Sequence, residues 1–165
     1  MTSVGINGLG RIGRLLTRRL FERHDARAAL RLTMCNEVAD AATVAHLLKY
    51  DSTHGRFAQP VVMDGDHLNI VDQTVLLTHE TAQSKIQWSD RDVNIVIDCT
   101  GVEFNRSSAA QHLGGSVSRV MLSQPASTDV DGTIIWGLND STLTPDMSVI
   151  SAGSCTSNAL MPVLS

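Results

Sequence analysis

The feature that most constrains this chain is a glycine-rich turn near its start, Gly8-Leu9-Gly10-Arg11-Ile12-Gly13. An apolar run from Ser3 to Asn7 precedes the turn and stops at Gly8, as a buried parallel strand does. After the turn, apolar residues recur at the spacing of one helix face: Ile12, Leu15, Leu16 and Leu20. Arginines fall mostly on the other face, which predicts a solvated side: Arg11, Arg14, Arg18 and Arg19. Strand, glycine turn and helix in this order predict the first unit of an α/β fold.

The rest of the chain continues this alternation. The predicted strands are residues 30–35, 93–99, 120–122, 133–136 and 148–150, and the predicted helices are 41–49, 107–113 and 156–164. In the helix 41–49 we expect Val44, Leu47 and Leu48 on the buried side. Short β-prone pieces at 61–63, 68–70 and 74–77 predict a small antiparallel excursion. The predicted fold class is therefore α/β, a Rossmann-type, doubly wound and mostly parallel sheet.

Composition excludes several classes of protein. Among 165 residues, 13 Lys and Arg face 17 Asp and Glu, and this net charge of −4 argues against a nucleic-acid surface. Apolar runs fall short of the ~18 residues of a membrane span, and the first residues do not resemble a secretory signal. The three cysteines are widely spaced, so we expect neither a disulfide framework nor a metal site, and a cytoplasmic location.

The glycine turn predicts a dinucleotide-binding site, because it follows a strand and opens a helix. Gly8 would permit the tight turn, Gly10 would let the backbone approach a pyrophosphate, and Gly13 would let the helix pack closely on the sheet. Glu37, at the end of the next strand, would accept hydrogen bonds from an adenosine ribose and repel an extra phosphate, which favours NAD over NADP. The alternative is an ordinary strand–helix turn with a surface glutamate.

A second segment, Ser151 to Asn158, places Cys155 at the start of a predicted helix, with Ser154 as its N-cap. A helix N-terminus stabilises a thiolate, and its N–H groups can stabilise an oxyanion, which is what a nucleophilic cysteine requires. The alternative is a small core cysteine near a helix cap. Cys35 and Cys99 lie within strand patterns and are predicted to be core residues.

Four collinear segments resemble the glyceraldehyde-3-phosphate dehydrogenase family: residues 4–14, 49–57, 98–101 and 154–158. Within the family, residues 36–41 and 45–50 look most like the D-erythrose-4-phosphate dehydrogenase branch, because Asn36-Glu37 stands where the glycolytic branch more often has Asn-Asp.

The resemblance implies a role for each matching residue. Cys155 would be the nucleophile, and Ser154 and Thr156 would contact substrate. Cofactor NAD would be held at its pyrophosphate by Arg11 and Ile12, at its adenosine ribose by Glu37, and near its nicotinamide by Ser123. The thiolate would attack a phosphorylated aldehyde, and the thiohemiacetal would pass hydride to NAD and leave a thioester. Water would resolve that thioester in the erythrose-4-phosphate branch, which makes 4-phosphoerythronate for the pyridoxal-phosphate pathway; inorganic phosphate does so in the glycolytic branch.

The resemblance also implies a domain organisation. Residues 1–150 would form the NAD-binding domain, and residues 151–165 would begin a catalytic domain whose remainder, with the thiol-activating histidine, lies outside this chain. The apolar side of helix 156–164 is then expected to pack on something outside it. Full-length members form tetramers, so a homo-oligomer is expected, with no nucleic-acid or membrane partner.

This chain departs from the family pattern at five positions. Around the nucleophile these are Ala152, Gly153, Ser157 and Ala159. Thr81 stands where these enzymes often carry a cofactor-contacting arginine. Three interpretations therefore remain open: the erythrose-4-phosphate enzyme, the glycolytic enzyme, and a truncated, non-catalytic NAD-binding module.

Overall fold

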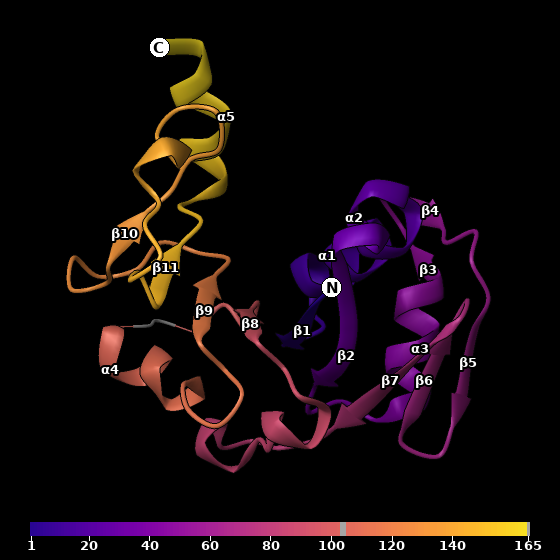
Figure 1. The fold of residues 1–165 in the computed structure, drawn as a ribbon. Coiled ribbons are helices and arrows are strands. Elements are labelled where there is room, and N and C mark those ends of the chain that lie inside the picture. The colour runs from indigo at the N-terminus through magenta and orange to yellow at the C-terminus, as the bar shows by residue number, and fades with distance from the viewer. Residues whose placement is uncertain (103–104, 165) are drawn as a thin grey trace.

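The glycine turn lies at the centre of a mostly parallel sheet in the computed structural model, which describes residues 1–102 and 105–164 (Figure 1). Within that range the strand order is β10-β11-β9-β8-β1-β2-β7-β6-β5. The strands are β1 (Thr2–Asn7), β2 (Leu30–Asn36), β5 (Val61–Asp64), β6 (His67–Ile70), β7 (Gln73–Thr78), β8 (Ile95–Asp98), β9 (Arg119–Leu122), β10 (Gly132–Thr133) and β11 (Val149–Ser151). A separate antiparallel pair consists of β3 (Tyr50–Asp51) and β4 (Gly55–Arg56).

Helices and 3₁₀ turns connect the strands. The helices are α1 (Arg11–Glu22), α2 (His24–Ala29), α3 (Ala41–Lys49), α4 (Arg106–Ala109) and α5 (Cys155–Leu164). The 3₁₀ turns are η1 (Gln83–Lys85), η2 (Trp88–Arg91), η3 (Ala110–His112) and η4 (Asp140–Thr142). Figure 1 shows α5, in yellow, extending beyond the sheet on the side opposite to β5, β6 and β7.

The predicted fold class is confirmed. Every pairing from β10 across to β7 is parallel. The predicted antiparallel excursion is β5–β6–β7, and it belongs to the main sheet because β7 pairs antiparallel with β6 and parallel with β2. The order reverses at β1, since β2 lies on one side of it and β8 on the other. That reversal is the switch point at which open α/β sheets bind ligands.

Two hydrophobic clusters cover the two faces of the sheet. Consecutive residues of one strand divide between them: Met34 belongs to one cluster and Cys35 to the other, and Val96 and Ile97 divide in the same way. Because side chains alternate across a strand, this division shows that both faces are buried. The apolar, non-alternating strands that suggested a parallel sheet reflect this burial.

Some local predictions were wrong, because tertiary contacts overrode the local pattern. Arg18, assigned to a solvated face, is buried: its Nε donates to the Leu48 carbonyl at 2.8 Å, and its guanidinium stacks 5.6 Å from the centre of the Phe57 ring. Ile12 and Leu47, expected to be buried, are 53% and 38% exposed. The predicted strand 133–136 is reduced to Gly132–Thr133.

Other boundaries shift or were missed. The predicted strand 93–99 shortens to Ile95–Asp98, and the predicted helix 107–113 divides into α4 and η3. The short helix α2 and the β3–β4 hairpin had no prediction. Helix 156–164 is confirmed as α5, which begins one residue earlier, and its apolar side chains Leu160, Met161, Val163 and Leu164 are exposed.

The closest backbone approach in the glycine turn predicts how the fold responds to substitution. A Cβ placed on Gly13 would lie 2.0 Å from the Gly8 carbonyl oxygen, whereas a Cβ on Gly10 meets nothing within 4 Å. We expect Gly13→Ala to lower the free energy of unfolding by about 3 kcal/mol, because α1 must move off β1. Gly10→Ala, the matched control, should change it by less than about 0.5 kcal/mol. Urea denaturation of both variants measures this, and equal stabilities would contradict the packing role of Gly13.

Candidate functional site

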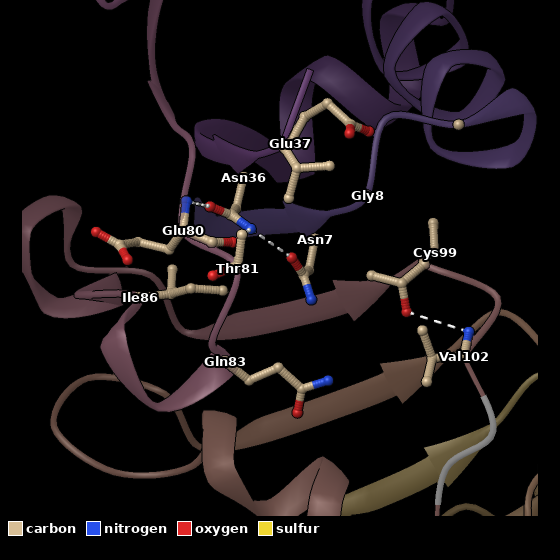
Figure 2. A pocket seen from close by; sticks show the side chains of 13 residues that line it. Asn7, Gly8, Asn36, Glu37, Glu80, Thr81, Gln83, Ile86, Cys99 and Val102 are labelled. Atoms are coloured by element: carbon tan, nitrogen blue, oxygen red, sulfur yellow. Dashed lines mark hydrogen bonds between the residues drawn. The ribbon is translucent and has the colours of Figure 1, made fainter. Parts of the chain in front are cut away.

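A cavity of about 330 Å³ opens at the carboxyl edge of the sheet, at the switch point between β1 and β8 (Figure 2). Its walls are the segments that follow four parallel strands. The lining residues are Asn7, Gly8 and Gly10 after β1, Asn36, Glu37 and Val38 after β2, Glu80, Thr81, Gln83 and Ile86 after β7, and Cys99, Thr100 and Val102 after β8.

The glycine turn gives the cavity an open backbone surface. Gly8 has a φ of 87° and lies against the backbone of Thr100, where a Cβ would approach within 2.9 Å. Gly10 precedes α1, and no side chain caps the helix through a hydrogen bond there. Within the described ranges, no side chain accepts from the N–H groups at the start of α1, and the positive end of the helix dipole favours an anion at this position. The space beside Gly10 admits a phosphate group.

Glu37 links the glycine turn to the end of β2. One carboxylate oxygen, Oε2, accepts a hydrogen bond from the Leu9 N–H at 2.7 Å, and the other, Oε1, accepts one from the Ala39 N–H at 3.2 Å. The carboxylate thus lies at the cavity with a fixed orientation, and each oxygen keeps lone-pair capacity for a hydroxyl group. The sequence does not predict the hydrogen bond between Glu37 and Leu9, because residue spacing alone does not show that this side chain points back toward the glycine turn.

The other predicted cofactor residues lie around the cavity rather than in its lining. Gly13 packs behind the turn, and Arg11 and Ile12 are exposed at the start of α1. Ser123 is half-buried after β9, and its N–H donates to the Asp98 carbonyl at 2.9 Å. The geometry therefore brings Gly8, Gly10 and Glu37 together in one cavity.

Residues 2–106 match the model of a protein family described as glyceraldehyde 3-phosphate dehydrogenase, NAD binding domain. The chain belongs to the glyceraldehyde-3-phosphate dehydrogenase family. NAD is the cofactor that this domain binds, and the chain is accordingly assigned to the NAD-dependent oxidoreductases. The residues present fit NAD, since an uncapped helix start, an open glycine and a fixed carboxylate border one cavity.

The segment predicted to carry the nucleophile follows β11 at the same edge of the sheet. Cys155 is the first residue of α5 and is exposed, so it is not a core cysteine. Ser154 caps the helix as predicted: its Oγ accepts a hydrogen bond from the Ser157 N–H at 2.9 Å. The same hydroxyl lies 2.8 Å from the Thr156 hydroxyl. The predicted substrate contacts Ser154 and Thr156 therefore bond to each other beside the thiol.

Gly153 explains one departure from the family pattern. Its φ is 71°, and a Cβ at this position would lie 2.6 Å from the Ile135 side chain. Only glycine adopts this backbone without strain, so the turn from β11 into α5 depends on it. Asn158 closes the turn by donating from Nδ2 to the Ala152 carbonyl at 2.8 Å.

The remaining cysteines are buried as predicted. Burial raises the pKa of the Cys99 thiol to about 11, and burial beside Cys99 raises the pKa of the Cys35 thiol still further. Both therefore remain protonated and unreactive near neutral pH.

No helix within 1–102 and 105–164 is long and apolar enough to span a membrane. In the same ranges, no group of three or more His, Cys, Asp or Glu side chains is arranged to hold a metal ion.

Exposure and ionisation together predict selective thiol chemistry. At pH 8, iodoacetamide should alkylate Cys155 in the native protein and leave Cys35 and Cys99 unmodified until the chain is unfolded. Peptide mass spectrometry of native and urea-treated samples measures this, and Cys155→Ser is the control that should remove the native-state label. Equal labelling of all three cysteines in the native protein would contradict the burial described above.

Proposed function

We propose that this chain contributes to NAD-dependent oxidation of a phosphorylated aldose aldehyde, erythrose 4-phosphate to 4-phosphoerythronate, with Cys155 as the nucleophile. The main support for the proposal is that the predicted cofactor residues and the predicted nucleophile lie at the same edge of the sheet. Parallel pairing places the glycine turn after β1, Glu37 after β2 and Cys155 after β11 at the same edge of one sheet. Three strand spacings separate β1 from β11, about 15 Å.

Each predicted residue has a role in this scheme. Gly8, Gly10 and Gly13 shape the turn, the N–H groups at Arg11 and Ile12 bind the pyrophosphate, and Glu37 accepts from the adenosine ribose. Ser123, two strands from β1 at the same edge, lies on the nicotinamide side. Ser154 and Thr156 present hydroxyls to the substrate, which requires them to exchange their mutual hydrogen bond for one to the ligand.

The chemistry begins at the sulfur of Cys155. The thiolate attacks the aldehyde carbon, the C=O double bond opens, and the start of α5 stabilises the resulting oxyanion. Bound NAD supplies the hydride acceptor. The thioester that remains on Cys155 is cleaved by water, which releases the phosphorylated acid and regenerates the thiol.

The choice of substrate rests on the branch resemblance at residues 36–41 and 45–50. The competing proposal within the same chemistry is glyceraldehyde 3-phosphate, with inorganic phosphate in place of water. A cytoplasmic location, assembly into a homotetramer and a domain division at residues 150 and 151 belong to the same proposal, and the family resemblance supports them.

One observation favours a different candidate, a non-catalytic NAD-binding module. Thr81 lines the cavity where family members often carry an arginine, so a cationic cofactor contact is replaced by a short hydroxyl side chain. This candidate retains the cofactor site and gives no role to Cys155.

Calorimetric titration tests the cofactor site directly. The chain should bind NAD, and Gly10→Val should weaken binding at least about tenfold, because its side chain fills the space where the pyrophosphate approaches. Glu37→Gln should narrow the preference for NAD over NADP by about tenfold, since the repulsive charge is lost. Gly132→Ala, in β10 outside the cavity lining, is the control for binding, because a Cβ at Gly132 meets no atom closer than 3.6 Å. Unchanged NAD affinity in Gly10→Val would contradict the assignment.

Hydride transfer by the protein tests both the substrate and the nucleophile. NADH formation should be faster with erythrose 4-phosphate than with glyceraldehyde 3-phosphate, and Cys155→Ser should abolish it with either aldehyde while NAD binding persists. Faster turnover of glyceraldehyde 3-phosphate would favour the glycolytic proposal. NAD binding without turnover would favour the non-catalytic module.

A further inference from the structure

Four adjacent parallel strands end in polar side chains that are in register with one another. Asp98 ends β8, Asn7 ends β1, Asn36 ends β2 and Thr78 ends β7. Asn7 is paired with Asp98 on one side and with Asn36 on the other, and Asn36 is paired with Thr78. Asp98, Asn7 and Asn36 are all buried, at 0%, 3% and 4% exposure. A row of polar groups therefore crosses the sheet directly beneath the cavity.

Hydrogen bonds run along this row in one direction, toward Asp98. Thr78 donates from Oγ1 to Asn36 Oδ1 at 2.9 Å, and Asn36 donates from Nδ2 to Asn7 Oδ1 at 2.9 Å. Asn7 then donates from Nδ2 to Asp98 Oδ2 at 2.7 Å. An ionised carboxylate only accepts, so Asp98 requires the Asn7 amide to present its nitrogen. The Asn7 oxygen must then face Asn36, and the Asn36 nitrogen must face Asn7. One charge thus fixes the orientation of two amides.

The same row holds two walls of the cavity, and Figure 2 shows the first of them, where Asn36 lies between Asn7 and Glu80. Asn36 Oδ1 accepts from the Glu80 N–H at 2.8 Å, and Asn36 Nδ2 donates to the Glu80 carbonyl at 3.0 Å, so the amide pairs with the chain after β7 as a neighbouring strand would. Asp98 Oδ1 accepts from Thr100 twice, from the N–H at 3.0 Å and from the hydroxyl at 2.7 Å. Glu80 and Thr100 both line the cavity.

A buried pair completes the surroundings of Asp98. His112 Nε2 lies 3.4 Å from Asp98 Oδ2, and His112 Nδ1 accepts a hydrogen bond from Trp88 Nε1 at 3.1 Å. Because Nδ1 is the acceptor, Nε2 carries the proton; it lies near the carboxylate but makes no hydrogen bond within the described part of the chain. Burial acts to raise the pKa of Asp98, but the nearby His112 and the hydrogen bonds from Thr100 and Asn7 outweigh it and leave the pKa of Asp98 lowered. The carboxylate therefore remains ionised.

We propose that Asp98 is the positioning residue of the NAD cleft. Its buried charge fixes the Thr100 wall directly and fixes the Glu80 wall, two strands away, through the orientations of Asn7 and Asn36. A buried carboxylate adds little to the free energy of unfolding, because the cost of removing it from water offsets most of the free energy of its hydrogen bonds. Stability alone therefore does not account for the charge at this position. The inference rests on the proposed cofactor site, and its primary test does not require NAD.

Removing the charge of Asp98 changes which side-chain atoms along the row must donate hydrogen bonds. In Asp98→Asn, the new amide keeps its oxygen toward Thr100 and presents a nitrogen to Asn7. The Asn7 amide must then flip, the Asn36 amide must flip in turn, and the Asn36 nitrogen faces the Glu80 N–H. The place where two hydrogen-bond donors face each other thereby moves from β8 to the loop after β7.

A double variant restores the original orientation of the Asn36 amide, with the negative charge moved from β8 to the neighbouring strand β1. In Asn7→Asp combined with Asp98→Asn, residue 98 donates to residue 7, and the carboxylate at residue 7 accepts from Asn36 Nδ2. Asn36 and Glu80 then keep their original partners. The contact to His112 is lost equally in the single and the double variant, so their comparison isolates the orientation of the amides.

Amide hydrogen exchange of the folded proteins is the decisive measurement. In Asp98→Asn the Glu80 N–H should exchange at least about tenfold faster than in the parent, as expected for loss of a buried hydrogen bond, and in the double variant it should return to within about threefold of the parent. The Gly8 N–H, which donates to the Asn36 carbonyl through the backbone, is the internal control for general loosening. If Glu80 keeps its protection in the single variant, or loses protection only in proportion to Gly8, the proposal is overturned.

NAD affinity supplies the functional readout. Calorimetry should show about tenfold weaker binding in Asp98→Asn, well below its unfolding temperature. Exchange that follows this pattern in a parent that does not bind NAD would overturn the proposed cofactor site and leave the wall-positioning role intact. A parent and an Asp98→Asn variant that bind NAD with equal affinity would overturn the positioning role and leave the cofactor site intact.

Discussion

The structure depends on how closely α1 approaches the end of β1. The Gly8 carbonyl occupies the space that a side chain at position 13 would need, and this contact fixes where the helix begins. Because α1 begins there, its free N–H groups lie beside the switch point of the sheet. Glu37 reinforces the arrangement from the neighbouring strand through its bond to the Leu9 N–H. The backbone surface for an anion, the cavity and the carboxylate beside it thus share one geometric origin.

The sequence was sufficient for the parts of the structure that local chemistry decides. The glycine turn, the alternation of strands and helices, the Ser154 cap and the burial of Cys35 and Cys99 all follow from backbone freedom, periodicity or hydrogen-bonding capacity within a few residues. The family match over residues 2–106 supports the same fold and cofactor. Residue spacing also placed Gly8, Gly10 and Glu37 around one site.

The parts that were missed depend on partners far away in the chain. Arg18 is buried because Leu48 and Phe57 meet it across a long separation, which a helical pattern does not contain. Trp136 lies in an apolar run that resembles a strand, yet it is 80% exposed because pairing ends at Thr133. The row from Asp98 to Thr78 was missed for a similar reason. A signal was present, since each of four strands ends in a polar residue, but only the strand order shows that these residues are neighbours.

Glu37 has a consequence for changing the cofactor that this site accepts. The simplest redesign toward NADP removes an acidic residue at the ribose position and introduces a neutral or basic one. In the proposed cofactor site the same carboxylate also holds the Leu9 and Ala39 amides, so its removal would release the glycine turn along with the proposed repulsion of an extra phosphate. In this proposal, the choice between NAD and NADP and the shape of the glycine turn therefore depend on the same side chain. A successful exchange of cofactor needs a new acceptor for the Leu9 N–H as well as a new partner for the phosphate.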